Sequence, residues 1–455
     1  MSRWFWALPE GGEGMERIHW TFVLCLRRAG FFCGSVFYPL LCFSDQKINP
    51  VVTYDQLFPL YAQPCALTQI KKTGKSAGGS PGHAVLYIKG MCRDKNAPYP
   101  RVEPCQKGID LTDPNSGVLI SVNKNFQNIN WIAFEGKTLS FHGGIPPYAP
   151  INTETKNQAI QNAIESGAFR GVRLLDHWEK TRPQGMTLEE SIARMGLATD
   201  YALDFGRKSY CNRIPISPAQ LKDMSEYLNK LNAPFIQGKQ AYHWNGVTNN
   251  CAHVVKNTLA AAGIRSAKST EHFLLGGLLD PVVPSNLILT TAEKTILKTI
   301  PEVTEYYRNP KIYNTLVKYG NTPIPYGVIF ETLPMHTQNN TLYELRDTLF
   351  TLDLPLLHPR KSKMAQLPSM PSHSDLETNL NIYREIYSEA LKSLKPLKAL
   401  IQENPELDEK GFSVFYDHYL NWLKNSLVDI SGKIQLLKIK DSLKSNSFQG
   451  SIFYF

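Results

Sequence analysis

Short runs of β-branched and aromatic residues, bounded by turn-forming residues, recur between residues 83 and 142. Runs of this kind predict strands. The predicted strands cover residues 83–89, 118–123, 131–135 and 138–142. The preceding stretch, residues 45–75, has a mixed extended and helical pattern and continues into a loop rich in Lys, Gly and Ser that ends at Gly82.

Four predicted helices follow the strands. They cover residues 154–166, 186–205, 217–232 and 251–262. Ser217-Pro218 supplies a cap and a first-turn proline, and Gly263 marks the end of the last helix. The strands and helices together predict one α+β domain that spans residues 45–345.

The C-terminal part of the chain has a different composition. Residues 355–374 are dense in Pro, Ser and Lys, which is typical of a linker. Two amphipathic helices are predicted in the region 375–447. Their apolar stripes are Leu376, Leu380, Tyr383, Tyr387 and Leu391, and Tyr416, Tyr419, Leu423, Leu427, Ile430, Ile434 and Leu437. Such stripes favour helices that pair as a hairpin against the preceding domain, with the stripes as core rather than as a ligand site.

The N-terminal segment predicts export. Residues 31–44 are almost entirely apolar and follow Arg27 and Arg28. This length matches the apolar region of a signal peptide and is too short to cross a membrane. We therefore expect residues 1–44 to be a signal segment and the mature protein to be periplasmic or secreted. A membrane-associated N-terminus is the alternative.

The overall composition narrows the choice of partners. The chain has 455 residues, of which 20% are charged and 42% hydrophobic, so most of it should be globular. Its net charge of +9 favours peripheral contact with anionic membrane or envelope surfaces. No block of five Lys or Arg residues occurs, and basic and aromatic residues do not alternate along any segment. Nucleic acid is therefore not an expected partner.

The cysteines that follow the signal segment are odd in number. Four of them can form two pairs, namely Cys65, Cys92, Cys105 and Cys211, and the fifth is Cys251. In an oxidising compartment four thiols can pair and one stays free. Cys92 and Cys105 flank a loop rich in Pro and charge, so we expect these two to pair. The alternative is that all five are reduced core cysteines. The absence of a CxxC motif argues against a structural zinc site.

The strongest chemical signal is the segment Thr248-Asn-Asn-Cys-Ala-His253. Asn249 or Asn250 can cap a helix, which would put Cys251 in the first turn. Free backbone N–H groups and the positive end of the helix dipole stabilise an anion there. The sequence therefore predicts a Cys251 thiol with a lowered pKa, and backbone donors for an oxyanion.

A base for this thiol is predicted at His83. It enters a strand from a Gly-rich loop, where an imidazole can lie open to a cleft and exchange a proton with a thiol. A third polar group must orient the ring. If the next strand pairs antiparallel, its end lies opposite His83, which nominates Asn123, with Ser121 on the same face.

Two segments carry a resemblance to a known superfamily. GHAVLYIKG at residues 82–90, followed far downstream by NNCAHVVKNTLAAAGI at residues 249–264, resembles the circularly permuted branch of the papain-like fold. That branch includes NlpC-type cell-wall peptidases, the lecithin:retinol acyltransferase family and exported bacterial proteins with a Gly-His strand and an Asn-Asn-Cys helix. This chain departs from the Asn-Cys-Glu-His pattern, since His253 stands in place of the glutamate, and its insert between His83 and Cys251 is long.

The resemblance implies a function. Cys251 would be the nucleophile, His83 the base and Asn123 the polar third member of a thiol hydrolase or acyltransferase. The enzyme would act on an amide or ester, in a cell-wall peptide or lipid acyl group, through an acyl-enzyme and without cofactor or metal. The alternative is a non-enzymatic secreted binding module on the same fold.

Several other residues near the motif could have either a functional role or a purely structural one. Tyr242, His243, Trp244 and His253 are candidates to line the site, although core packing explains the aromatic pair equally well. A zinc site of His243, Cys251 and His253 fits no common ligand spacing. Asp204 and Arg207, three residues apart on one predicted helix face, are expected to form a salt bridge.

Overall fold

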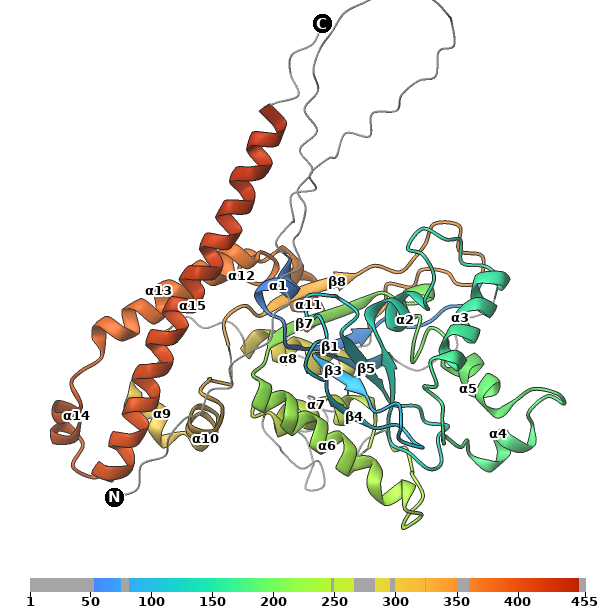
Figure 1. Ribbon diagram of the computed structural model, residues 1–455, viewed down its shortest axis with the longest axis horizontal. Coiled ribbons are helices and arrows are strands. Elements are labelled where there is room, and N and C mark those ends of the chain that lie inside the picture. The colour runs from blue at the N-terminus through green and yellow to red at the C-terminus, as the bar shows by residue number, and fades with distance from the viewer. Residues whose placement is uncertain are drawn as a thin grey trace, which may run out of the picture. The chain divides into compact units, whose positions relative to one another are not determined.

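The computed structural model describes residues 53–74, 82–246, 249–265, 283–294, 299–323, 325–349 and 360–449. The predicted signal segment, residues 1–44, lies outside these ranges. No helix within them is both long enough and apolar enough to cross a membrane. The described residues form a mixed α+β structure, as the sequence predicts, and their main sheet is antiparallel (Figure 1).

The main sheet has the strand order β6-β5-β2-β1-β7-β8, and every neighbouring pair is antiparallel. Its strands are β1 (Tyr61–Leu67), β2 (His83–Lys89), β5 (Gly117–Ser121), β6 (Ile132–Glu135), β7 (Ser209–Pro215) and β8 (Ile329–Leu333). A separate ribbon joins β3 (Met91–Arg93) to β4 (Val102–Pro104). The central strands β1, β2 and β5 are buried along their whole length. Such strands are covered on both faces, so their sequences are largely apolar rather than alternating.

Helices account for most of the other described residues. Those that precede residue 300 are α1 (Tyr54–Leu57), α2 (Lys137–His142), α3 (Thr153–Glu165), α4 (Asp176–Lys180), α5 (Leu188–Gly196), α6 (Pro218–Ile236), α7 (Cys251–Ala261) and α8 (Pro284–Lys294), with a 3₁₀ turn η1 (Leu203–Phe205). The later ones are α9 (Val303–Arg308), α10 (Pro310–Tyr319), α11 (Arg360–Gln366), η2 (Leu367–Ser369), α12 (Pro371–Ser374), α13 (Leu376–Ser393), α14 (Leu397–Glu403) and α15 (Glu409–Gln449).

Helices cover both faces of the sheet. Tyr87 pairs with Gln63 across β2 and β1, so Ala66, three residues further along β1, points to the opposite face. Phe141 of α2 lies against Tyr87, with 6.3 Å between the ring centroids. On the other face, Ile288 of α8 packs against Ala66. Helix α7 contacts both β2 and α8.

Two disulfides lie within the described residues. Cys92–Cys105 links the middle of β3 to the residue that follows β4, which confirms the pairing predicted from the loop between them. Cys65–Cys211 links β1 to β7, where the two residues are directly paired in the sheet. Cys251 is the one free cysteine in the described ranges.

Two predicted elements are wrong. Residues 138–142 are not a strand but belong to helix α2, which ends at Gly143 in a left-handed conformation with φ of 63°. A run of five residues is too short for periodicity to separate the two structures. The helix predicted over 186–205 ends at Gly196, because Ala198 and Ala202 adopt positive φ in the turn that follows. Strands β1, β7 and β8 of the main sheet and the ribbon strands β3 and β4 were not predicted.

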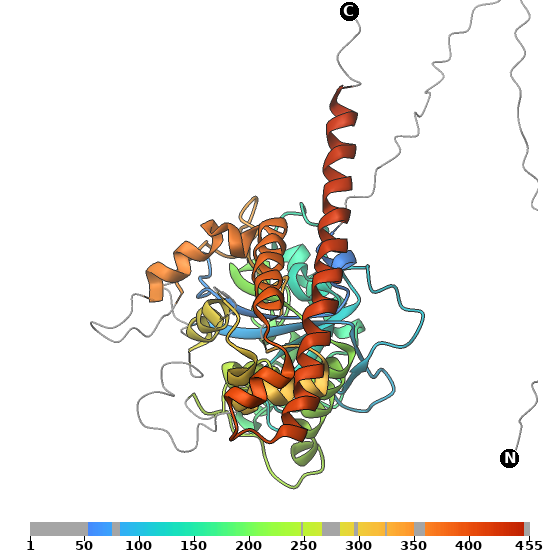
Figure 2. The same cartoon turned by 90° about the vertical axis from the view of Figure 1, so that its left-hand side faces the viewer.

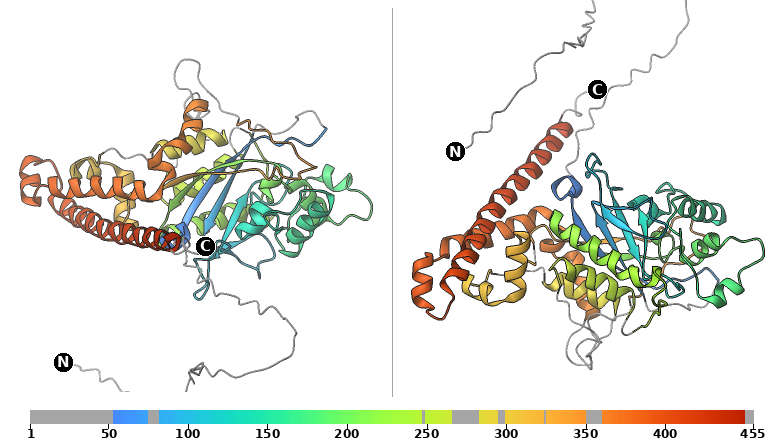
Figure 3. Two further views of the ribbon diagram at one scale, coloured as in Figure 1. Left: turned by 90° about the horizontal axis from the view of Figure 1, so that it is seen from above. Right: turned by 60° about the horizontal axis from the view of Figure 1, so that its bottom comes forward.

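The C-terminal helices form a second apolar core. Leu380, Tyr383 and Tyr387 of α13 are buried with Leu423 and Ile430 of α15, so the two stripes pack together as predicted. Figure 2 and the left view of Figure 3 show α13 (orange) running beside α15 (red). The expected linker differs from the structure, because residues 360–374 form α11, η2 and α12. Met364 and Leu367 of this segment are buried against α8.

Candidate functional site

Cys251 is the first residue of helix α7. Asn250 is the N-cap: its Oδ1 accepts a hydrogen bond from the backbone N–H of His253 at 3.2 Å. The neighbouring Asn249 has another role, since its Nδ2 donates to the carbonyl oxygen of His243 and its Oδ1 accepts from Asn130. The cap fixes the start of the helix, so the Cys251 thiol lies beside the unpaired N–H groups of the first turn.

The sulfur of Cys251 contacts the strand that carries His83. The backbone N–H of Ala84, the second residue of β2, donates to Sγ at 3.4 Å. The Cys251 side chain is buried, with 8% of the residue exposed. A hydrogen bond of this kind stabilises negative charge on sulfur more than it stabilises the neutral thiol.

Burial nevertheless dominates the protonation of this thiol. It raises the pKa of Cys251 to about 11, although the N–H groups of Ala84, Ala252 and Cys251 itself act to lower it. The prediction of a lowered pKa from the helix N-terminus is therefore wrong. The helix and strand donors are present, but the loss of water around the sulfur outweighs them.

The imidazole of His83 is tied to a buried polar chain. Its Nε2 lies 2.9 Å from Oγ of Ser121, the last residue of β5. The Ser121 hydroxyl donates to Oδ1 of Asp200 at 2.7 Å, and Nδ2 of Asn123 donates to Oδ2 at 2.7 Å. All four residues are more than nine-tenths buried. We refer to His83, Ser121, Asp200 and Asn123 as the polar relay.

The polar relay determines which imidazole nitrogen carries the proton. The single hydrogen of the Ser121 hydroxyl goes to Asp200, because an ionised carboxylate only accepts. Oγ of Ser121 must then accept from Nε2–H of His83. Nδ1 is left with a free lone pair and is the nitrogen that can take a proton. Burial, assisted by the charge of Arg207, lowers the pKa of His83 to about 3, so the ring is neutral at rest.

Asn123 does not touch His83 directly. The sequence predicted Asn123 as the residue that orients the ring, but the residue that hydrogen-bonds the ring is Ser121. Asn123 instead donates a hydrogen bond to Asp200, which in turn accepts from Ser121. Asp200 was not among the site residues predicted from the sequence. Burial raises its pKa to about 6, while its hydrogen bonds to Ser121 and Asn123 and the charge of Arg207 lower it.

A buried arginine completes the electrostatics of the site. Arg207 donates to the carbonyl oxygens of Ala198 and Thr68, both at 2.8 Å, and 2% of it is exposed. Its charge acts to lower the pKa of Cys251. The expected salt bridge between Asp204 and Arg207 is absent, because Asp204 pairs with His142 instead.

The other candidate lining residues fall into two groups. Tyr242 is completely buried, and its hydroxyl has no hydrogen-bond partner among the described residues. Burial raises the pKa of Tyr242, and negative charge on Cys251 raises it further, so this phenol lies within electrostatic reach of the thiol. His253 is buried with Nδ1 bonded to Asn250, whereas His243 and Trp244 are exposed.

The arrangement unites a thiol, a helix N-terminus, a strand N–H and a buried relay that leaves Nδ1 of His83 unprotonated. In the described part of the chain, no hydrogen bond joins the His83 ring to Sγ of Cys251. Within the same ranges, no three His, Cys, Asp or Glu side chains are grouped so that they could hold a metal ion. Comparisons with protein-family models, curated proteins and solved structures find no match for this chain.

Proposed function

We propose that this chain is an exported thiol hydrolase or acyltransferase of the permuted papain-like type, acting on an amide or ester. The observation that carries the proposal is the free thiol of Cys251 at the start of α7, in hydrogen-bond contact with the residue that follows His83. The polar relay behind His83 supports it, because a buried carboxylate and hydroxyl that hold one tautomer are useful to a general base. The two disulfides support export.

The proposed reaction uses the groups described above. Nδ1 of His83 takes the proton of Cys251 as Sγ attacks the carbonyl carbon of the substrate. The oxyanion that forms accepts hydrogen bonds from the N–H groups at the start of α7 and from the hydroxyl of Tyr242. The imidazolium then gives its proton to the departing amine or alcohol, which leaves an acyl-enzyme. Water, an amine or a hydroxyl attacks the acyl group, and its proton returns through His83 to Sγ.

The proposed substrates come from the resemblance and from charge. Cell-wall peptides and lipid acyl groups are the substrate classes of the superfamily that the motifs resemble. Both occur at anionic surfaces, and the net charge of +9 favours contact with such surfaces. No cofactor is part of the proposal.

A second candidate is a secreted binding module on the same fold. One observation favours it. Burial raises the pKa of Cys251 to about 11 and lowers that of His83 to about 3, so both groups are neutral and do not form an ion pair. A thiol that remains neutral and buried is a core residue rather than a nucleophile.

The deciding experiment is intact-mass labelling with iodoacetamide from pH 5 to 9. It compares the wild type with Cys251→Ala, His83→Ala and a matched control, His177→Ala, on the short helix α4. If His83 activates the thiol, one label adds rapidly and its rate levels off below pH 8. Cys251→Ala abolishes that label, His83→Ala removes the plateau, and His177→Ala changes neither.

The binding-module candidate gives a different profile. A thiol with a pKa near 11 reacts through its small thiolate fraction, so its labelling rate rises about tenfold per pH unit up to pH 9. The enzyme proposal fails if the wild type shows this steady rise and His83→Ala leaves it unchanged.

A further inference from the structure

Helix α15 exposes apolar side chains on the face opposite to its core contacts. Val428, Leu436 and Ile439 are 75%, 49% and 57% exposed. Their spacings of eight and three residues place them within about a quarter of the helix circumference. Ile430 and Ile434, which are buried in the C-terminal core, lie on the opposite side of the helix. We refer to Val428, Leu436 and Ile439 as the exposed stripe.

The exposed stripe is accessible to large partners. Gly432 lies between Val428 and Leu436 on the same side of the helix, and a Cβ atom there would have no heavy atom within 4 Å beyond its chain neighbours and the backbone of the helix itself. Figure 1 and the right view of Figure 3 show the C-terminal half of α15 (red) extending beyond the other described helices and strands. No other helix or strand in the described ranges exposes more than one large apolar side chain. Single exposed apolar residues are ordinary, whereas a group of them marks an interaction surface.

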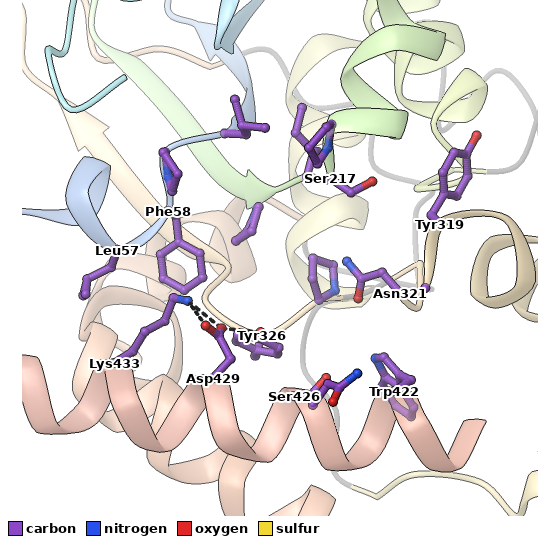
Figure 4. A pocket seen from close by; sticks show the side chains of 18 of the residues that line it. Leu57, Phe58, Ser217, Tyr319, Asn321, Tyr326, Trp422, Ser426, Asp429 and Lys433 are labelled. Carbon is purple, nitrogen blue, oxygen red and sulfur yellow. Dashed lines mark hydrogen bonds and ion pairs between the residues drawn. The ribbon is translucent and has the colours of Figure 1, made fainter. Parts of the chain in front are cut away.

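The one acidic residue in this part of α15, Asp429, is neutralised within the protein. Lys433 Nζ lies 2.5 Å from Asp429 Oδ2, and the hydroxyl of Tyr326 donates to the same oxygen at 2.5 Å (Figure 4). Among the described side chains of α15, this is the one ion pair that is present. Asp429 therefore leaves no uncompensated negative charge beside the exposed stripe.

Two lysines border the exposed stripe. Lys424 lies about one turn before Val428, and Lys438 directly precedes Ile439. Both lysines are exposed, and neither forms an ion pair with another described residue. The surface therefore combines apolar side chains with uncompensated positive charge. Helices that lie at the interface of anionic membranes have this combination.

We propose that the exposed stripe and its two lysines dock the protein on an anionic lipid bilayer. Helix α15 would lie along the membrane surface, with the stripe at the boundary between headgroups and acyl chains. Lys424 and Lys438 would lie among the lipid phosphates. A second copy of the chain fits this surface less well, because a stable protein interface uses about 20–30 residues on each side. The proposal does not depend on the thiol chemistry around Cys251.

Co-sedimentation of the full mature chain with vesicles tests the proposal. The vesicles contain phosphatidylcholine alone or phosphatidylcholine mixed with phosphatidylglycerol. The wild type is expected to bind the mixed vesicles, to bind them less at high NaCl, and to bind phosphatidylcholine alone far more weakly, because salt screens the attraction between lysines and anionic headgroups. Two double variants, Val428→Gln with Leu436→Gln and Lys424→Gln with Lys438→Gln, should each lower the affinity for mixed vesicles by about 25-fold, which is about fivefold for each side chain.

A single substitution is expected to have the opposite effect. Gly432→Leu adds an apolar side chain to the stripe where space is open, so the affinity for mixed vesicles should rise about fivefold. The matched control is Ile109→Gln, which changes an apolar residue that is 43% exposed and lies outside α15. It should bind like the wild type.

The proposal is overturned if the wild type binds both kinds of vesicle equally, or if neither double variant nor Gly432→Leu changes the affinity. It is also overturned if sedimentation without vesicles shows a dimer that Val428→Gln with Leu436→Gln dissociates, because the stripe would then contact a second copy of the chain.

Discussion

Replacing Asp200 by Asn tests the buried carboxylate of the polar relay through the pH dependence of stability. Burial raises the pKa of Asp200 to about 6 in the folded protein, against 3.8 for an ordinary carboxyl group. The folded state therefore holds this proton more tightly than the unfolded chain. The resulting stabilisation is fully present below about pH 4 and is lost as the pH rises through 6.

The size of the effect follows from the two pKa values. Relative to neutral pH, protonation of Asp200 stabilises the folded state by about 1 kcal/mol at pH 5 and about 2 kcal/mol at pH 4. An asparagine at this position would keep the shape of the side chain without titrating. The free energy of unfolding of the wild type minus that of Asp200→Asn should therefore increase by about 2 kcal/mol between pH 7.5 and 4. His83 and His253 titrate in both proteins, so the difference isolates the carboxylate.

Urea denaturation at pH 7.5, 6, 5 and 4, with the disulfides intact, measures this difference. Asp223→Asn is the matched control. Although burial acts to raise the pKa of Asp223, hydrogen bonds from Lys318 and Tyr319 lower it overall. The free energy of unfolding of the wild type minus that of Asp223→Asn should therefore decrease toward low pH. If the difference in free energy of unfolding between the wild type and Asp200→Asn stays constant or decreases toward low pH, the pKa of Asp200 is not raised. The relay would then not hold its protons as described above.

Three further predictions concern the site and the sheet. Ser121→Ala removes the hydroxyl that hydrogen-bonds both His83 and Asp200, and it should slow iodoacetamide labelling of Cys251 at pH 6 by about tenfold, measured by intact mass. Tyr242→Phe should slow an acylating probe by about 100-fold and leave iodoacetamide unaffected, because only acylation forms an oxyanion. A protein carrying both Cys65→Ser and Cys211→Ser should lose about 5 kcal/mol in denaturant titrations, since that disulfide closes a separation of 146 residues.

Local signals predicted the secondary structure around Cys251 and His83 well. The Asn-Asn-Cys segment begins a helix at Cys251 because capping depends on side chains within three residues. The strand that starts at His83 was predicted with its observed bounds, because seven consecutive buried residues give a strong composition signal. The Cys92–Cys105 pair was predicted because only a short loop separates the two thiols.

Features that depend on distant residues were not predicted. Asp200 lies 79 residues from Ser121, and nothing in its neighbourhood marks it as a relay member; an acidic residue in a run of apolar ones is the only available signal. Strand β1 contains Pro64, which argues against a central strand, yet its neighbours β2 and β7 hold it in place. The pKa of Cys251 was predicted with the wrong sign because sequence reveals the helix dipole but not the depth of burial.

The position of β1 has a consequence for biosynthesis. It is the first strand of the sheet to leave the ribosome, and one of its edges has no partner until β7, made more than a hundred residues later, is available. An open edge of this kind invites pairing with other chains. Cys65 meets Cys92 and Cys105 before it meets Cys211, so oxidation in order of synthesis would favour the wrong thiols. Correct maturation therefore requires that Cys65 stay reduced, or be reshuffled, until the second half of the sheet has arrived.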